Sequence, residues 1–169
     1  DALAAGLQRA GVARGDRVAT LLYNSPEQLL LWFACAKLGA VVAPLNVGLV
    51  GEDLAYTLAN VAPRLFVTDA EGHAKLAAPG ARRDDLRVYL VGEAGAPGTR
   101  PYAELVIPGA RADEPALSPA DPCCILYTGG TTGLPKGVLL PQFYYVVSAY
   151  RWTHMLKLTP EDRHYSVLQ

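Results

Sequence analysis

The chain has 169 residues, which is enough for one well-packed domain. Hydrophobic residues make up 51% of it and charged residues 18%, a composition that excludes an intrinsically disordered segment. Lysine and arginine number 15 against 16 acidic residues, so the net charge is −1 and the chain lacks the overall basic charge typical of nucleic-acid-binding proteins. We therefore expect no nucleic-acid partner, although this balance still permits a local anion site.

Residues 1–91 alternate between helical and strand patterns. Apolar residues at helical spacing predict amphipathic helices, and short apolar runs rich in β-branched residues predict buried strands. The predicted helices are residues 2–10, 26–38, 52–61 and 71–77. The predicted strands are residues 17–23, 41–45, 64–68 and 87–91. This alternation is typical of βαβ units, so we expect an α/β fold with layered helices and a largely parallel sheet.

The helix at 26–38 has recognisable signals at both ends. Ser25 is expected to cap it, Pro26 occupies the first helical position, and Gln28 has the spacing of a capping box. Gly39 follows as the stop. Its buried face is predicted to consist of Leu30, Ala34 and Leu38.

The alternation of helix and strand patterns ends after residue 91. Residues 92–121 contain five prolines and four glycines, which leave little regular structure except at 102–107 and suggest a connector between subdomains. Strands are predicted at 122–127 and 138–140, and a long helix from Pro141 to about Leu158. We therefore expect a βαβ portion at 1–91, a connector at 92–121 and the start of a second subdomain at 122–169.

The loop between the last two predicted strands is dense in glycine and threonine and ends in a lysine. Glycines allow consecutive backbone N–H groups to face an oxyanion, threonine hydroxyls add donors, and lysine adds a mobile positive charge. It contains no carboxylate, histidine or cysteine, so it suits anion binding and not proton transfer. The candidate phosphate-binding residues are Thr128, Gly129, Gly130, Thr131, Thr132, Gly133 and Lys136.

This loop has two other interpretations. A Walker-type P-loop fails because Pro135 stands where glycine is needed and Gly137 where serine or threonine is needed. Taken alone, a loop of this composition is also compatible with a plain hairpin turn.

The segment Tyr127–Gly137, Y-T-G-G-T-T-G-L-P-K-G, resembles the phosphate-binding signature of the adenylate-forming superfamily, which includes acyl-CoA synthetases and peptide-synthetase adenylation domains. The usual form is Y-T-S-G-T-T-G-x-P-K-G, so Gly129 replaces a serine. Residues 15–19, 24–27 and 37–46 also resemble the early part of the family's large N-terminal domain. The resemblance covers essentially the whole chain.

This resemblance implies a ligase that uses ATP and Mg²⁺ to convert a carboxylic acid into an acyl-adenylate and then transfers the acyl group to coenzyme A. Thr128 to Gly133 and Lys136 are implied to hold the β- and γ-phosphates, with Thr128 nearest the metal. The family's later elements are absent here, so no catalytic residue is expected within the chain, which is expected to be inactive alone and to depend on the rest of a parent chain. A carrier-protein-dependent acyl or amino-acid adenylation domain and a non-catalytic nucleotide-binding module remain as alternatives. The acid, the oligomeric state, the full metal ligand set and the effect of Gly129 stay open.

The cysteines and the chain ends indicate where in the cell the protein is expected to be. Cys35, Cys123 and Cys124 are odd in number and lack C-x-x-C spacing, which favours reduced, packed thiols in a cytoplasmic protein. We expect no signal peptide, because the first residues show no basic-then-apolar pattern. It closes on an apolar run at 164–169, so we expect a piece of a longer chain. The apolar stretch 29–50 contains Lys37 and several breakers, so no transmembrane segment is expected.

The helix predicted after Pro141 carries five aromatic residues. They are compatible with an acyl channel, but their spread around the helix favours core and interface packing. They are Phe143, Tyr144, Tyr145, Tyr150 and Trp152.

Overall fold

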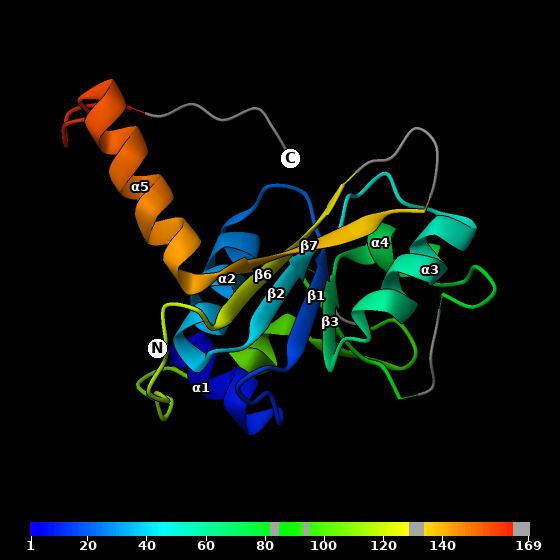
Figure 1. The fold of residues 1–169 in the computed structure, drawn as a ribbon. Helices are drawn as coiled ribbons and strands as arrows, with labels where there is room; N and C mark the ends of the chain where they lie inside the picture. Colours follow the sequence, from blue (N-terminus) through cyan, green and yellow to red (C-terminus); the bar gives the residue numbers. More distant parts are fainter. Residues whose placement is uncertain (82–84, 93–94, 129–133, 164–169) are drawn as a thin grey trace.

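A seven-stranded sheet lies between two layers of helices in the computed structural model, which describes residues 1–81, 85–92, 95–128 and 134–163 (Figure 1). The strand order is β5-β4-β3-β1-β2-β6-β7, and every neighbouring pair is parallel except the antiparallel pair β6–β7. The strands are β1 (Arg17–Leu21), β2 (Val41–Pro44), β3 (Leu65–Thr68), β4 (Arg87–Leu90), β5 (Thr99–Pro101), β6 (Pro122–Thr128) and β7 (Lys136–Pro141). The predicted α/β fold with a largely parallel sheet is confirmed.

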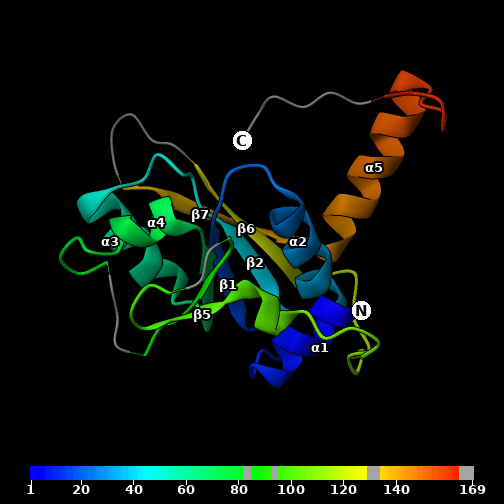
Figure 2. The ribbon, with the colours of Figure 1, turned by 180° about the vertical axis from the view of Figure 1, so that it is seen from behind.

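The helices cover both faces of this sheet, as the apolar strands require. The covering helices are α1 (Ala2–Arg9), α2 (Pro26–Leu38), α3 (Gly51–Val61), α4 (Ala70–Lys75) and the short 3₁₀ helix η1 (Tyr102–Leu105), whereas α5 (Gln142–Leu156) extends away from the sheet. One apolar core joins α1, α2 and η1 to the sheet, and a second core joins α3 to its other face (Figure 2). Within the described residues, no helix has the length and apolar character needed to cross a membrane.

The ends of α2 form as its sequence predicts. The Ser25 side-chain oxygen accepts a hydrogen bond from the Gln28 backbone N–H at 3.2 Å, and Gly39 adopts the left-handed conformation at φ 66°. The second half of the capping box does not form, because both polar atoms of the Gln28 side-chain amide are buried without a hydrogen-bond partner among the described residues.

The predicted buried face of α2 is partly wrong. Ala34 and Leu38 are buried as expected, but Leu30 is 54% exposed and Leu31 takes its place beside Cys35 in the core. The first two turns of α2 carry apolar residues on every side, so helical spacing could not identify the face that packs on the sheet.

The segment 92–121 is more ordered than its composition suggests. The stretch predicted as its regular part contains η1, and β5 adds a parallel edge strand beside β4. Strand β5 was missed because it has three residues and ends in proline, a combination that carries no strand periodicity. Strands β6 and β7 belong to the same sheet as β1 to β5.

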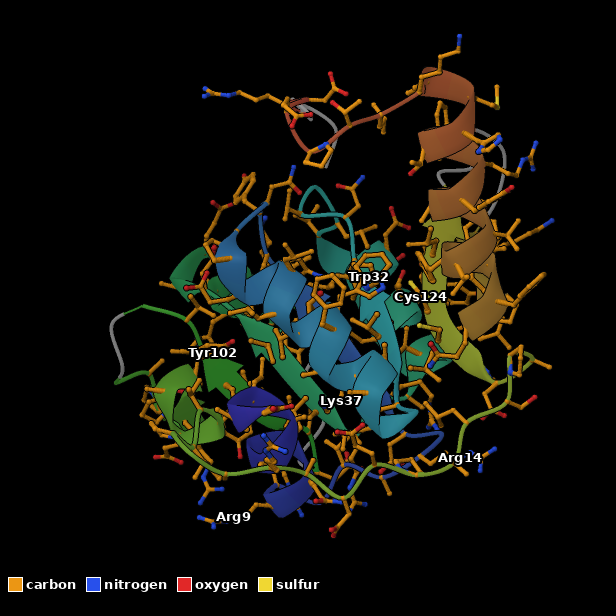
Figure 3. The ribbon with its side chains drawn as sticks, turned by 90° about the vertical axis from the view of Figure 1, so that its left-hand side faces the viewer. Arg9, Arg14, Trp32, Lys37, Tyr102 and Cys124 are labelled. Carbon is orange, nitrogen blue, oxygen red and sulfur yellow. The ribbon has the colours of Figure 1, made fainter. Side chains whose placement is uncertain are left out.

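The three cysteines are buried and unpaired by disulfides, as their composition suggested. Burial raises the pKa of the Cys124 thiol to about 12 and also raises those of Cys35 and Cys123. Cys124 lies on β6 in the same core that Trp32 of α2 packs against (Figure 3). These thiols therefore act as small apolar core groups.

Candidate functional site

The β6–β7 hairpin brings together the two ends of the predicted phosphate-binding segment. Thr128 ends β6, Lys136 begins β7, and the two residues are paired in the antiparallel register. The Thr128 hydroxyl donates a long hydrogen bond of 3.4 Å to the Lys136 backbone carbonyl. Because both residues are exposed, the Thr128 hydroxyl oxygen and the Lys136 ammonium group lie side by side at the tip of the strands.

The remaining candidates of this segment, residues 129–133, lie outside the described residues. They are Gly129, Gly130, Thr131, Thr132 and Gly133. The prediction that they bind phosphate therefore stays a prediction.

Lys136 carries the positive charge of this site. Within the part of the chain that the structure describes, its ammonium group forms no hydrogen bond or ion pair. In contrast, Lys37 contacts the carboxylates of Asp1 and Glu114, and Lys75 contacts that of Glu71 at 2.9 Å. None of the described residues therefore occupies any of the three Lys136 donors, which suits the binding of an external anion.

The site lies where β1, β2 and β6 end, at the carboxyl edge of the parallel strands. Ligands of open α/β sheets bind preferentially at this edge. A cavity of about 390 Å³ opens there next to Tyr127. Its walls come from the segment after β1 with α2, from the end of β2, and from β6; they include Asn24, Gln28, Trp32, Asn46 and Leu126. The unpartnered Gln28 amide therefore lines a cavity beside the start of the phosphate-binding segment.

Tyr127 connects the β6–β7 hairpin to helix α3. Its hydroxyl donates a hydrogen bond of 2.5 Å to the Asn60 side-chain carbonyl, which belongs to the last turn of α3. Partial burial and the neighbouring Tyr56 raise the pKa of the Tyr127 hydroxyl, so it remains a neutral donor near pH 7. The sequence singled out Tyr127 as part of the motif but gave no signal for Asn60, because the two residues are 67 positions apart.

A family model for AMP-binding enzymes matches residues 1–169. The chain belongs to the AMP-binding enzyme family. This confirms the resemblance that the motif at 127–137 and the upstream segments indicated. The match extends over both helical layers and the whole described sheet, and is therefore not confined to the hairpin.

Individual relatives of this AMP-binding enzyme chain agree with the family. It is 38% identical over 165 residues to an indoleacetate–CoA ligase of Aromatoleum aromaticum, covering 95% of the chain and 32% of the relative. It is 32% identical over 166 residues to a crotonobetaine/carnitine–CoA ligase of Salmonella typhi, covering 94% and 32%. The chain thus spans about a third of the length of the curated relatives it matches.

The comparison with solved structures also leads to CoA ligases. A Rhodopseudomonas palustris protein named as a long-chain-fatty-acid CoA ligase superposes with a TM-score of 0.85 at 29% sequence identity. The superposition covers 95% of this chain and 40% of the other. The order of strands and helices described above is therefore that of solved members of the adenylate-forming enzymes.

Proposed function

We propose that this chain is the N-terminal part of an AMP-forming acid–thiol ligase and that it supplies the phosphate-binding segment. The overall reaction has two steps. A carboxylate oxygen attacks the α-phosphorus of ATP, forming an acyl-adenylate and releasing pyrophosphate. The thiol of coenzyme A then attacks the acyl carbon, and AMP leaves.

The role proposed for this segment is to hold the β- and γ-phosphates. Thr128 and Lys136 would contact them from the two sides of the hairpin, and Gly129, Gly130, Thr131, Thr132 and Gly133 would supply backbone and hydroxyl donors. Donors fixed before reaction stabilise the charge that develops on departing pyrophosphate without costly reorganisation. The observation that carries the proposal is the pairing of Thr128 with Lys136, whose ammonium group is left without a carboxylate among the described residues.

Magnesium fits this site only as an ion bound largely by phosphate oxygens. The described residues contain no group of three or more histidine, cysteine or acidic side chains arranged to hold a metal. The Thr128 hydroxyl is an exposed oxygen at the right end of β6, and hard cations such as Mg²⁺ take oxygen ligands while keeping several waters. When bound with ATP, the ion would screen the phosphate charges.

Coenzyme A is the acceptor proposed here in preference to a carrier protein, because both curated relatives described above are named as CoA ligases. Indoleacetate is the first acid to test, since the relative named for it shares 38% identity with this chain. The proposal also includes three further points. They are a connector at 92–121 with subdomains on either side of it, a parent chain that supplies the rest of the enzyme, and a cytoplasmic location.

Titration of the chain with magnesium pyrophosphate tests the phosphate-binding role directly. We expect binding by the wild type and a dissociation constant at least about tenfold higher for Lys136→Ala, because charge-assisted hydrogen bonds contribute about 1.5–3 kcal/mol. ATP–pyrophosphate exchange with a panel of acids should be absent for the chain alone and present for the parent protein.

Lys157→Asn is the matched control. Lys157 is an exposed lysine at the end of α5 with φ 53°, a conformation that asparagine tolerates, so this variant removes one positive charge away from the hairpin without strain. Equal loss of pyrophosphate affinity in Lys157→Asn and Lys136→Ala would show a general charge effect and contradict the proposal. Absence of binding by the wild type would contradict it as well.

A further inference from the structure

We propose that Asn60 of α3 is a positioning residue that holds Tyr127 and thereby fixes the base of the phosphate-binding segment. This inference rests on the function proposed above for that segment. Asn60 does not reach the phosphates itself in this proposal; it acts through the Tyr127 ring on the pair formed by Thr128 and Lys136.

The end of the β6–β7 hairpin needs such an anchor. On the side of β2, β6 is joined to the sheet through one register pair, Val42 with Cys124, and β2 ends two residues later at Pro44. Residues 126–128 of β6 are paired with β7, which is the edge strand of the sheet. The last residues of the hairpin therefore depend on contacts outside the ladder for their position.

The Tyr127–Asn60 hydrogen bond provides one such contact. It joins the hairpin to α3 at 2.5 Å, immediately before Thr128. Helix α3 is itself fixed to the sheet by its buried residues Leu54, Leu58 and Val61. The bond thus connects the outer end of a two-stranded ribbon to an element packed in the core, and Figure 1 shows α3 beside this end of the hairpin.

Gly137 makes room for the ring that carries this bond. It lies directly opposite Tyr127 in the register. A Cβ atom at Gly137 would lie 2.9 Å from the Ile125 Cγ2, 3.2 Å from the Tyr127 Cζ and 3.4 Å from its hydroxyl oxygen. A side chain here would clash with the Ile125 methyl group and push the phenol by a few tenths of an ångström, so we group Asn60, Tyr127 and Gly137 as one unit, which we call the hairpin clamp.

Hydrogen exchange of the backbone amides at residues 126–128 and 136–138, followed by NMR in the 169-residue chain, tests the clamp. We expect Asn60→Leu, which keeps the side-chain size but accepts no hydrogen bond, to speed exchange of these amides about fivefold. Tyr127→Phe should have the same effect, and the double variant should be no faster than either single one, because both remove one bond. Asn60→Asp, which still accepts from the phenol, should restore wild-type exchange.

The Tyr150→Phe variant is the control, since Tyr150 is an exposed tyrosine on α5, and it should leave these amides unchanged. Unchanged exchange in Asn60→Leu, additive effects of Asn60→Leu and Tyr127→Phe, or no rescue by Asn60→Asp would each overturn the positioning role. The dissociation constant for magnesium pyrophosphate, measured in the same samples, should rise up to about fivefold in both Asn60→Leu and Tyr127→Phe. A wild-type chain that binds no pyrophosphate contradicts the proposed function, whereas the exchange rates decide whether the clamp exists.

Discussion

Gly6 is the residue of α1 whose missing side chain matters most for packing. A Cβ atom there would lie 1.7 Å from the Leu105 carbonyl oxygen and 2.4 Å from its carbonyl carbon, both of which are backbone atoms of η1. Alanine in a helix is otherwise favoured over glycine by about 1 kcal/mol. We expect Gly6→Ala to lower the free energy of unfolding by about 2 kcal/mol, since overpacking against backbone exceeds that gain. Urea denaturation measures the difference.

Gly15→Ala is the control for Gly6→Ala, because it shows the effect of backbone strain on stability without the effect of close packing. Gly15 has φ 84°, but a Cβ atom at this position would have no neighbouring atom within 4 Å, so its replacement incurs only the left-handed penalty of about 1–2 kcal/mol. The denaturant slope should stay near the wild-type value in both variants. A Gly6→Ala protein as stable as the wild type would show that α1 and η1 separate without loss of stability, contrary to the packing described here.

Structural features of single residues could be predicted where they depend only on residues nearby in the sequence. Ser25 and Gly39 delimit α2 because capping and the left-handed conformation depend only on neighbouring backbone. The close approach at Gly6, the exposure of Leu30 and the bond from Tyr127 to Asn60 depend on residues distant in sequence. No periodicity in one chain encodes these contacts, so they appeared only in the structure.

At the scale of elements, Asp121 joins the segment 92–121 to the rest of the molecule. Its carboxylate accepts hydrogen bonds from the Arg14 guanidinium at 2.8 and 2.9 Å and from the Ser118 backbone N–H at 2.8 Å. Its backbone carbonyl accepts one from the Gln142 N–H at the start of α5. The Ser118 bond and the Arg14 bond lower the pKa of Asp121 below its ordinary value of 3.8.

Asp121→Asn should therefore destabilise the chain in a pH-dependent way. A carboxyl group with a lower pKa in the folded state stabilises that state above its unfolded pKa, and the contribution is lost as pH falls through the folded value. We expect a lower urea midpoint than wild type at pH 7 and convergence of the two midpoints as the pH falls below 3.8.

Asp113→Asn is the control for this titration. The Asp113 side chain is exposed, and its carboxylate forms no hydrogen bond or ion pair within the described ranges. Its midpoint should follow that of the wild type at every pH. A difference for Asp121→Asn that is the same at pH 7 and pH 3 would contradict the electrostatic explanation.

The elements themselves were largely predictable because most are long enough to show a period. Of the elements in the described ranges, all five α-helices and six of the seven strands were anticipated, with bounds that differ by a few residues. Strand β7 begins at Lys136, inside the motif, two residues before the predicted start, because the pairing with β6 extends it. Pairing is a property of two strands, so the sequence of one strand could not set that bound.

At the scale of the whole molecule, the alternation of helices and strands predicted a parallel sheet but not its order. Placing β6 beside β2 requires a crossover through the connector, which no local pattern specifies. The same placement sets the phosphate-binding segment at the carboxyl edge, next to the cavity that Gln28 and Trp32 line. The motif was thus predictable from sequence, whereas its surroundings follow from the topology.

Helix α5 is the least covered helix among the described residues. It has no buried residue, and it extends away from the sheet in Figure 1. Large apolar side chains are exposed around it: Phe143, Tyr144, Val146, Tyr150, Trp152, Met155 and Leu156. Near its start, the Tyr145 ring packs edge-on against Trp32 of α2, with the ring centroids 5.4 Å apart. Because helices apolar on all sides are normally covered, the chain by itself should associate through this surface.

The double variant Trp152→Glu/Met155→Lys tests this expectation. The two side chains are 59% and 71% exposed, so the variant should keep the wild-type free energy of unfolding within about 0.5 kcal/mol when both proteins are measured at a concentration at which they are monomeric. Sedimentation velocity should show the concentration-dependent association of the wild type reduced or abolished. Tyr145→Glu, which removes the contact with Trp32, should instead lower the melting temperature. A double variant that associates as strongly as the wild type would show that the outer turns of α5 are not the associating surface, and the aromatic residues there would need another role.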